Sequence, residues 1–266
     1  ELVLVGSTGR IGVPLPMPNV RTGIENAIAR LDTSPEHAAQ VAEAIMTSDT
    51  RPKQIAVEFS LGGKRTRIGG VCKGAGMIQP GMSATGKRPP ALHATMLCFI
   101  TTDAAITSAG LHLAVEQAGA QSFNRITVDG DMTTNNTVLV LANGRAGKVS
   151  ATNTNAFQAA LDHVTLELAK MIVRDGEGGS RVVTVRVDGA KSVREADGAA
   201  RAIANSALVK TSWCGGDPNW GRILGALGYS PATIVEEKID VAYSLPGSAK
   251  RLFALRKGQP TNTPFH

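Results

Sequence analysis

Two strand patterns joined by a glycine turn constrain this chain more than any other feature. Residues 54–60 and 64–72 alternate apolar and polar side chains, and Leu61-Gly62-Gly63 lies between them. So short a glycine-containing link between two strand patterns predicts a β-hairpin with antiparallel strands. Adjacent hairpin strands disfavour an all-parallel, doubly wound sheet. Because helical patterns are mixed with the strands elsewhere, we expect an α+β or layered α/β fold.

Helical patterns account for much of the remaining chain. Ser34 followed by Pro35 is typical of a helix start, and Ser192 with Glu195 three residues later forms a capping box. The expected helices are residues 20–31, 34–46, 108–118, 155–173 and 192–207. Further strands are expected at residues 2–5, 181–188 and 233–243, and a turn at residues 7–9.

Composition restricts the class of protein. The chain has 266 residues, 42% of them hydrophobic, which is enough for a sizeable core in one domain or two lobes. Cys72, Cys98 and Cys214 are scattered, so they indicate neither a disulfide framework nor a zinc site. No apolar run approaches the roughly 18 residues of a membrane span. We therefore expect a cytoplasmic protein.

The charge pattern points to small ligands. The formal net charge is +6, but Lys and Arg are dispersed and aromatic residues make up only 4% of the chain. Nucleic-acid interfaces usually gather basic residues and aromatics into one patch, so this pattern argues against nucleic acid as a partner. A mild positive field would suit small anionic substrates.

Ala94-Thr95 stands before an apolar, strand-like run, residues 96–100. If this bond were cut, Thr95 would carry a free α-amine beside its own hydroxyl. Such an amine titrates near pH ~7.7–8.0 and can act as the base for the hydroxyl nucleophile. Taken alone, the pair is more typical of a threonine that begins a buried strand.

Further motifs follow one another in a definite order. They are Ser7-Thr8-Gly9, residues 68–80 (IGGVCKGAGMIQP), residues 101–104 (TTDA), residues 129–137 (DGDMTTNNT) and residues 217–223 (DPNWGRI). Together with Ala94-Thr95, this series resembles the ornithine acetyltransferase family, the glutamate N-acetyltransferases of the cyclic arginine pathway. The resemblance covers essentially the whole chain. It implies a layered sandwich with helices outside two stacked β-sheets and the nucleophile at the start of an inner strand.

The resemblance also implies an activity. The protein would cleave itself between Ala94 and Thr95, so that residues 1–94 are the end of an α chain and residues 95–266 the start of a β chain. Thr95 would then carry acetyl from N2-acetyl-L-ornithine to L-glutamate, without a metal or bound organic cofactor. Acetyl-CoA as a second donor stays open. Relatives extend beyond both ends of this sequence and form larger assemblies, so we expect truncation at both ends and a heterotetramer or larger assembly of the two pieces.

The family's site residues map onto five further positions. Thr8 and the Gly9 N–H are implied as the oxyanion hole, and Thr47 as a substrate contact. Lys73 is implied to bind the substrate carboxylate, and Glu177 to hold the substrate amino group or assist proton transfer. Each residue also has a plainer interpretation: a strand-ending turn at Thr8 and Gly9, a helix-end threonine, a solvent-facing lysine and an exposed loop carboxylate.

An insertion before Thr95 is the main departure from the family. It creates a second pair, Ala84-Thr85, nearly at the family distance from Lys73 but followed by Gly-Lys-Arg. We favour Thr95 because a nucleophile has to be fixed by a rigid element. Two other functions stay open: an aminopeptidase or amidase, in which water accepts the acyl group, and a non-catalytic amino-acid-binding protein. Asp129 and Asp131 are interpreted as structural supports rather than magnesium ligands.

Overall fold

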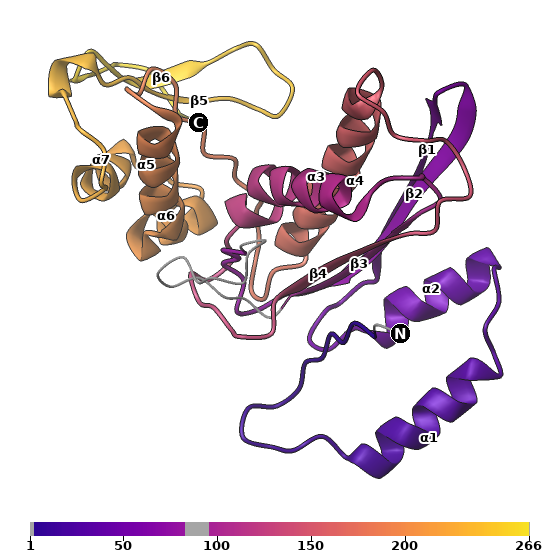
Figure 1. Ribbon diagram of the computed structural model, residues 1–266. Coiled ribbons are helices and arrows are strands. Elements are labelled where there is room, and N and C mark those ends of the chain that lie inside the picture. The colour runs from indigo at the N-terminus through magenta and orange to yellow at the C-terminus, as the bar shows by residue number, and fades with distance from the viewer. Residues whose placement is uncertain (1–2, 83–95, 266) are drawn as a thin grey trace. The chain divides into compact units, whose positions relative to one another are not determined.

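The computed structural model describes residues 3–82 and 96–265, so Thr95 and the alternative Thr85 lie outside the described residues. The chain divides into two compact units, Glu1–Gly179 and Ser180–His266 (Figure 1). This boundary differs from the predicted cleavage position, because a compact unit is defined by contacts in space and not by chain breaks. The predicted division at residue 95 therefore stays a prediction.

Unit 1 is built on a four-stranded mixed sheet. Its strands, in spatial order, are β1 (Lys53–Leu61), β2 (Lys64–Lys73), β3 (Leu97–Thr102) and β4 (Thr137–Ala142). β1 and β2 form the predicted antiparallel hairpin, β3 is antiparallel to β2, and β4 is parallel to β3. The turn residues Gly62 and Gly63 have φ angles of 60° and 77°. Two consecutive positive φ angles match the turn that suits the twist of a two-residue hairpin, and glycine adopts them at little cost.

Two helices cover one face of this sheet. They are α3 (Ser108–Gln121), which continues into the short 3-10 helix η1 (Phe123–Arg125), and α4 (Thr154–Arg174). The apolar stripe of α4, including Leu161 and Leu168, is fully buried with Ile100 of β3 in the main core. At Gly70 an added Cβ would lie 3.0 Å from both Leu168 Cδ1 and Ile100 Cγ1. The helix therefore approaches β2 at a point where a side chain would force it outward.

The sheet register brings three strand ends to one edge. Leu97 at the start of β3 is paired with Lys73 at the end of β2 and with Thr137 at the start of β4. The N–H of Thr137 also donates to the carbonyl oxygen of Met96, at 2.9 Å. The chain thus enters β3 at the edge where the motif of residues 68–80 leaves β2.

The N-terminal segment follows the predictions only in part. Helices α1 (Met17–Ile28) and α2 (Pro35–Ala44) form, and the Ser34 hydroxyl accepts a hydrogen bond from the His37 N–H at 3.3 Å. The strand predicted at residues 2–5 is wrong for residues 3–5, which are outside any strand, with Val3 81% exposed. An apolar run forms a strand only where a neighbouring backbone pairs with it.

Unit 2 contains helices around a small core and a short sheet. Its elements are α5 (Val193–Asn205), α6 (Ala207–Gly215), α7 (Trp220–Gly228), η2 (Glu236–Lys238), β5 (Val241–Tyr243), β6 (Leu252–Arg256) and β7 (Gln259–Pro260). Ser192 caps α5 as predicted, by accepting from the Glu195 N–H. The strand predicted at residues 181–188 is wrong, and only residues 241–243 of the one predicted at 233–243 form, because alternation alone supplies no pairing partner.

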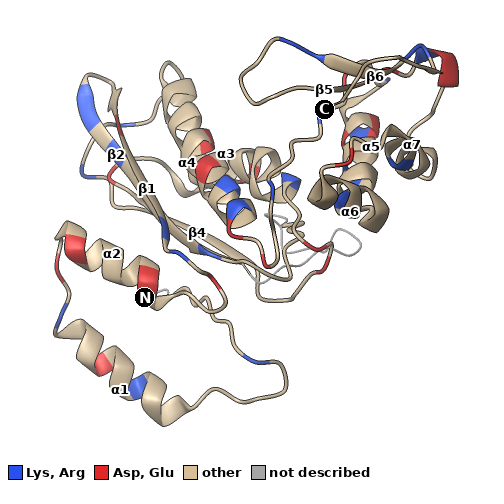
Figure 2. Cartoon of the chain, turned by 180° about the vertical axis from the view of Figure 1, so that it is seen from behind, with Lys and Arg blue, Asp and Glu red and all other residues tan. Residues whose placement is uncertain are grey.

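The predicted fold class is confirmed, since helices and mixed or antiparallel sheets occur in both units. Stacking of two sheets stays a prediction. Basic and acidic residues are interspersed along the elements, as the sequence indicated (Figure 2). Within residues 3–82 and 96–265, no helix is long and apolar enough to cross a membrane.

Candidate active site

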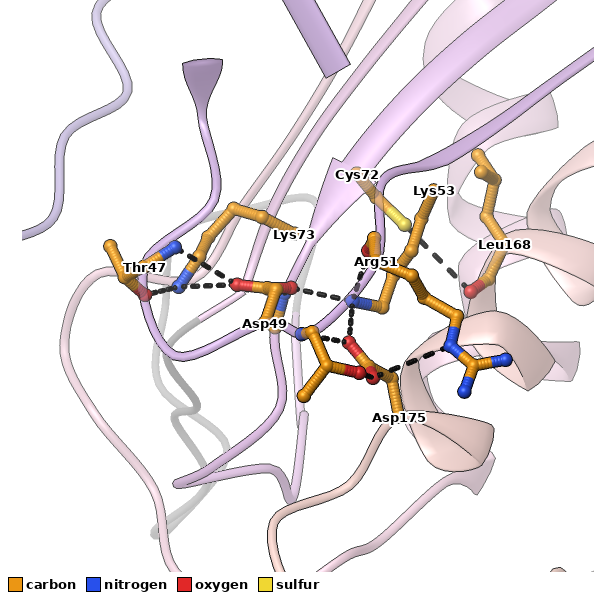
Figure 3. A network of polar contacts seen from close by, with 10 residues as sticks. Thr47, Asp49, Arg51, Lys53, Cys72, Lys73, Leu168 and Asp175 are labelled. Carbon is orange, nitrogen blue, oxygen red and sulfur yellow. Dashed lines mark hydrogen bonds and ion pairs between the residues drawn. The ribbon is translucent and has the colours of Figure 1, made fainter. Parts of the chain in front are cut away.

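Lys73 is the centre of the candidate site. It is the last residue of β2, and its side chain is only 2% exposed. Its ammonium donates to the Thr47 hydroxyl at 2.5 Å and lies 3.6 Å from Asp49 Oδ2 (Figure 3). Burial lowers the pKa of Lys73, and the negative charge of Asp49 offsets part of that shift. The solvent-facing interpretation of this lysine is therefore wrong.

Thr47, the hydroxyl partner of Lys73, lies on the segment between α2 and β1. The residue is exposed, so its hydroxyl is placed where the buried ammonium meets the surface. Its own N–H donates to Asp49 Oδ2 at 3.1 Å. This backbone bond fixes the threonine relative to the carboxylate that also faces Lys73.

Glu177 comes from the loop after α4 and joins the same edge of the sheet. Its N–H donates to the carbonyl oxygen of Ala75 at 2.9 Å, two residues beyond Lys73. The carboxylate lies directly over Gly76, where an added Cβ would be 2.6 Å from Glu177 Cδ. The missing side chain at Gly76 thus creates the space that the Glu177 carboxylate fills.

Thr8 and Gly9 are placed by their neighbours near the start of β3. The carbonyl oxygen of Ser7 accepts from Asn135 Nδ2 at 3.1 Å, and the next residue, Asn136, accepts from the Met96 N–H at 2.8 Å. The turn predicted at residues 7–9 is wrong; the turn lies at residues 11–12. Among the described residues, no hydrogen bond joins Thr8 or Gly9 to the other candidate residues. The structure brings Thr47, Lys73 and Glu177 together, whereas Thr8 and Gly9 are linked to the start of β3 only through the contacts of Ser7, Asn135 and Asn136.

Asp129 supports the motif that follows β2. Its carboxylate accepts from the N–H groups of Met77 at 2.7 Å and Ile78 at 3.0 Å, and from that of Asp131. Met77 has a φ of 51°, an uncommon value for a non-glycine residue, so this bond holds a strained position. Within the described part of the chain, no group of three or more His, Cys, Asp or Glu could hold a metal. The geometry agrees with a structural role for Asp129.

The buried cysteines are poor candidates for the nucleophile. Cys72 and Cys98 are fully buried in the core of unit 1. Burial raises the pKa of Cys72 to about 12 and the pKa of Cys98 well above its usual value. Since the thiolate is the reactive form, these thiols are inert at neutral pH.

A buried charge cluster beneath Lys73 was not predicted from the sequence. The Lys53 ammonium, 1% exposed, lies 2.6 Å from both Asp49 Oδ1 and Asp175 Oδ2. Burial raises the pKa of each carboxyl, but hydrogen bonds from Lys53 and from backbone or hydroxyl donors outweigh it, so both pKa values fall below the usual range. One signal was available: Asp175 is the C-cap of α4, where the helix dipole disfavours a negative charge.

Comparison with known proteins identifies the chain's relatives. Residues 1–264 match the ArgJ family. The "Arginine biosynthesis bifunctional protein ArgJ" of Symbiobacterium thermophilum is 50% identical over 245 residues, covering 91% of this chain and 58% of that protein. The "Glutamate N-acetyltransferase" of Methanocaldococcus jannaschii is 49% identical over 242 residues, with the same coverage. The chain thus spans about three-fifths of the length of these curated relatives.

A solved structure shows the same relationship. The crystal structure of the arginine biosynthesis bifunctional protein ArgJ from Bacillus halodurans superposes with a TM-score of 0.56 and 38% sequence identity. The match covers 62% of this chain and 76% of that one. With a family match over nearly its whole length, the chain belongs to the ArgJ family of ornithine acetyltransferases.

Proposed function

We propose that the protein containing this chain transfers acetyl from N2-acetyl-L-ornithine to L-glutamate in arginine biosynthesis, through an acetyl ester on Thr95. One observation carries the proposal: Lys73, Thr47 and Glu177 meet at the edge of the sheet where Met96, the residue after Thr95, enters β3. The Lys73 ammonium and the Glu177 carboxylate are complementary in charge to the carboxylate and the amino group of an amino-acid substrate.

The proposed chemistry begins with self-cleavage. The Thr95 hydroxyl attacks the Ala94 carbonyl carbon, the peptide C–N bond breaks, and water hydrolyses the resulting ester. The products are a carboxylate on Ala94 and a free amine on Thr95. That amine then serves as the base for the neighbouring hydroxyl.

Acetyl transfer follows as a double displacement. Thr95 Oγ attacks the acetyl carbonyl of N2-acetylornithine, the amide C–N bond breaks, and ornithine leaves with the hydroxyl proton. The glutamate amine next attacks the ester, its C–O bond breaks, and the proton returns to Thr95. Thr8 and the Gly9 N–H stabilise the oxyanion in each step; loss of one such donor typically costs ~10²–10³ in rate.

Lys73 and Glu177 orient both substrates in this proposal. Among the described residues, the Lys73 ammonium contacts Thr47 and Asp49. A lysine ammonium has three N–H donors, so these two contacts leave one N–H for a ligand. The remaining N–H binds the substrate carboxylate. Glu177, exposed beside it, binds the substrate amino group.

Pairing within the sheet would hold the two pieces together after the proposed cleavage. β2 belongs to the first piece and β3 to the second, and their antiparallel register runs from Ile68↔Thr102 to Lys73↔Leu97. β3 is also flanked by β4, so it is an inner strand. We therefore expect the pieces to copurify, in a heterotetramer or a larger assembly, and to separate only in denaturant.

Intact mass and N-terminal sequencing of the purified full-length protein test the cleavage. A fragment that begins Thr-Met-Leu-Cys supports Thr95, one that begins Thr-Gly-Lys-Arg moves the nucleophile to Thr85, and an uncut chain refutes the mechanism. A labelled acetyl donor tests the transfer: label should appear on glutamate. Free acetate formed at the same rate without glutamate would instead indicate an amidase.

The same assay addresses the co-substrate. The proposed reaction needs no metal or bound organic cofactor, and activity should survive dialysis against a chelator. Replacing N2-acetylornithine by acetyl-CoA decides whether a second donor is used, since N-acetylglutamate forms only if Thr95 accepts that acetyl group. Because the substrates are metabolites of the cytoplasm, we expect the protein there.

A further inference from the structure

The Lys53 ammonium links two segments that are distant in the sequence. Lys53 begins β1, whereas Asp175 is the C-cap of α4, 122 residues later. Each of the three ammonium N–H groups has an acceptor: Asp49 Oδ1, Asp175 Oδ2 and the Arg51 carbonyl oxygen at 3.3 Å (Figure 3). A buried lysine with every donor occupied has no group left to offer a ligand. Lys53 therefore acts on the candidate site only through its partners.

Asp49 connects Lys53 to the end of β2. Besides the Lys53 ammonium, its Oδ1 accepts from the Gly74 N–H at 2.6 Å, and its Oδ2 accepts from the Thr47 N–H. The same Oδ2 lies 3.6 Å from Lys73 Nζ. One carboxylate thus holds the backbone on both sides of the contact between Lys73 and Thr47.

Asp175 connects Lys53 to the loop that contains Glu177. It precedes Glu177 by two residues, and it accepts from both the N–H, at 2.9 Å, and the hydroxyl of Thr50. Thr50 is close in sequence to Thr47. The two carboxylates therefore fasten the loop with Glu177 to the segment with Thr47.

We propose that Lys53 is a positioning residue for substrate binding, which holds the Asp49 and Asp175 carboxylates so that Lys73 and Glu177 keep their places. This inference rests on the proposed function, in which Lys73 binds the substrate carboxylate. Without Lys53, Asp49 has Lys73 as its nearest buried cation and draws that ammonium away from the substrate.

The charge balance argues for a functional role. Buried ion pairs contribute little net stability, because desolvation offsets most of the attraction, and apolar side chains of similar volume often serve as well. Among these four buried groups, two ammonium ions face two carboxylates. Lys53 supplies one of the two positive charges, and this allows Lys73 to share Asp49 rather than neutralise it alone.

Lys53→Met in the full-length protein tests the inference. We expect KM for N2-acetylornithine and for glutamate to rise at least tenfold, with kcat changed less than threefold, because binding and not the Thr95 chemistry is disturbed. Lys64→Met, on the exposed start of β2, is the matched control and should change neither constant. In the Lys73→Met background, Lys53→Met should raise KM less than it does in the parent, because only the part of its effect that passes through Asp175 and Glu177 remains.

A charge-balanced variant separates positioning from folding. Lys53→Met/Asp175→Asn keeps one buried carboxylate, Asp49, for one buried ammonium, Lys73, and should melt near the parent Tm. Its KM should stay at least tenfold raised. A folded double variant with KM within twofold of the parent would overturn the inference.

Amide hydrogen exchange gives a readout that does not need activity. We expect the N–H groups of Thr47, Thr50 and Gly74 to exchange at least tenfold faster in Lys53→Met than in the parent, with exchange in α3 unchanged. If the parent transfers no acetyl, the proposed function fails, but this comparison still tests whether Lys53 holds the segments with Thr47, Thr50 and Gly74 in place. Unchanged exchange at all three amides would overturn the inference whatever the activity.

Discussion

Gly76→Ala is the sharpest test of the candidate site, because one methyl group would occupy the space that the Glu177 carboxylate fills. An added Cβ would lie 2.6 Å from both Cδ and Oε1 of Glu177, and 2.7 Å from Oε2. Ordinary contacts begin at 3.4 Å, so the carboxylate has to move by about 0.8 Å. The backbone of Gly76 is not in the left-handed region, so alanine itself is tolerated there.

The expected cost falls on activity and not on stability. Misplacing a group that orients the substrate by about 1 Å can cost ~10²-fold, or about 2.7 kcal/mol of transition-state binding. For a slightly smaller shift we expect kcat/KM to fall about 10- to 100-fold. The atoms that the new methyl group would meet are at the end of the flexible, exposed Glu177 side chain. The free energy of unfolding should therefore change by less than about 1 kcal/mol.

The assay combines steady-state acetyl transfer with urea unfolding of the full-length protein. Gly23→Ala in α1 is the matched control, since no atom lies within 4 Å of its added Cβ. It should leave kcat/KM unchanged and stabilise the helix by up to about 1 kcal/mol. Glu177→Gln shows the effect of removing the charge without the collision. If Gly76→Ala folds and keeps kcat/KM within twofold of the parent, the assigned role of Glu177 is refuted.

Three further outcomes follow from the same geometry. Burial lowers the pKa of Lys73, so its ammonium should lose its proton, and KM should rise, at a pH below the usual lysine pKa of 10.5. A pH series on Lys73→Arg, which stays charged, should lack this rise in KM. The pKa values of Asp49 and Asp175 are lowered in the folded protein, so their contribution to stability should be complete above the ordinary carboxyl pKa of 3.8. This contribution should be lost as the pH falls through the pKa values that the two groups have in the folded state. Urea midpoints that stay constant down to about pH 2 would contradict this. Gly147→Ala should destabilise unit 1 by about 1–3 kcal/mol in urea unfolding, since its Cβ would collide with the Leu61 carbonyl oxygen, and an unchanged midpoint would count against that packing.

Local chemistry made several elements predictable. Gly62 and Gly63 adopt positive φ angles that suit a tight hairpin, so the turn and its two strands could be predicted from adjacent residues. Ser34 and Ser192 each accept a hydrogen bond from an N–H three residues later, which a helix start requires wherever it lies in the protein. These signals involve only neighbours in the chain.

The wrong strand predictions have the opposite cause. Val3 to Val5 and residues 181–188 carry apolar or alternating patterns, yet the structure gives them no strand. A strand exists only when another backbone supplies its hydrogen bonds, and that partner is distant in sequence. Local pattern therefore predicts the tendency but not the pairing.

The candidate site shows the same division. The motifs indicated Thr47, Lys73 and Glu177, but not that Lys73 is buried or that Gly76 makes room for the Glu177 carboxylate. The contact between Lys53 and Asp175 joins residues 122 positions apart, and each alone resembles an ordinary surface charge.

The sequence by itself determined the hairpin, the helix starts and, through the order of its motifs, the family. Those properties depend on backbone angles and on hydrogen bonds between near neighbours. Only the tertiary structure decided which charges are buried, which carboxylates share one ammonium and which strands find a partner. Burial and long-range pairing depend on how β2, β3 and α4 pack together, and the free energy of a charge is set by the groups that surround it in space.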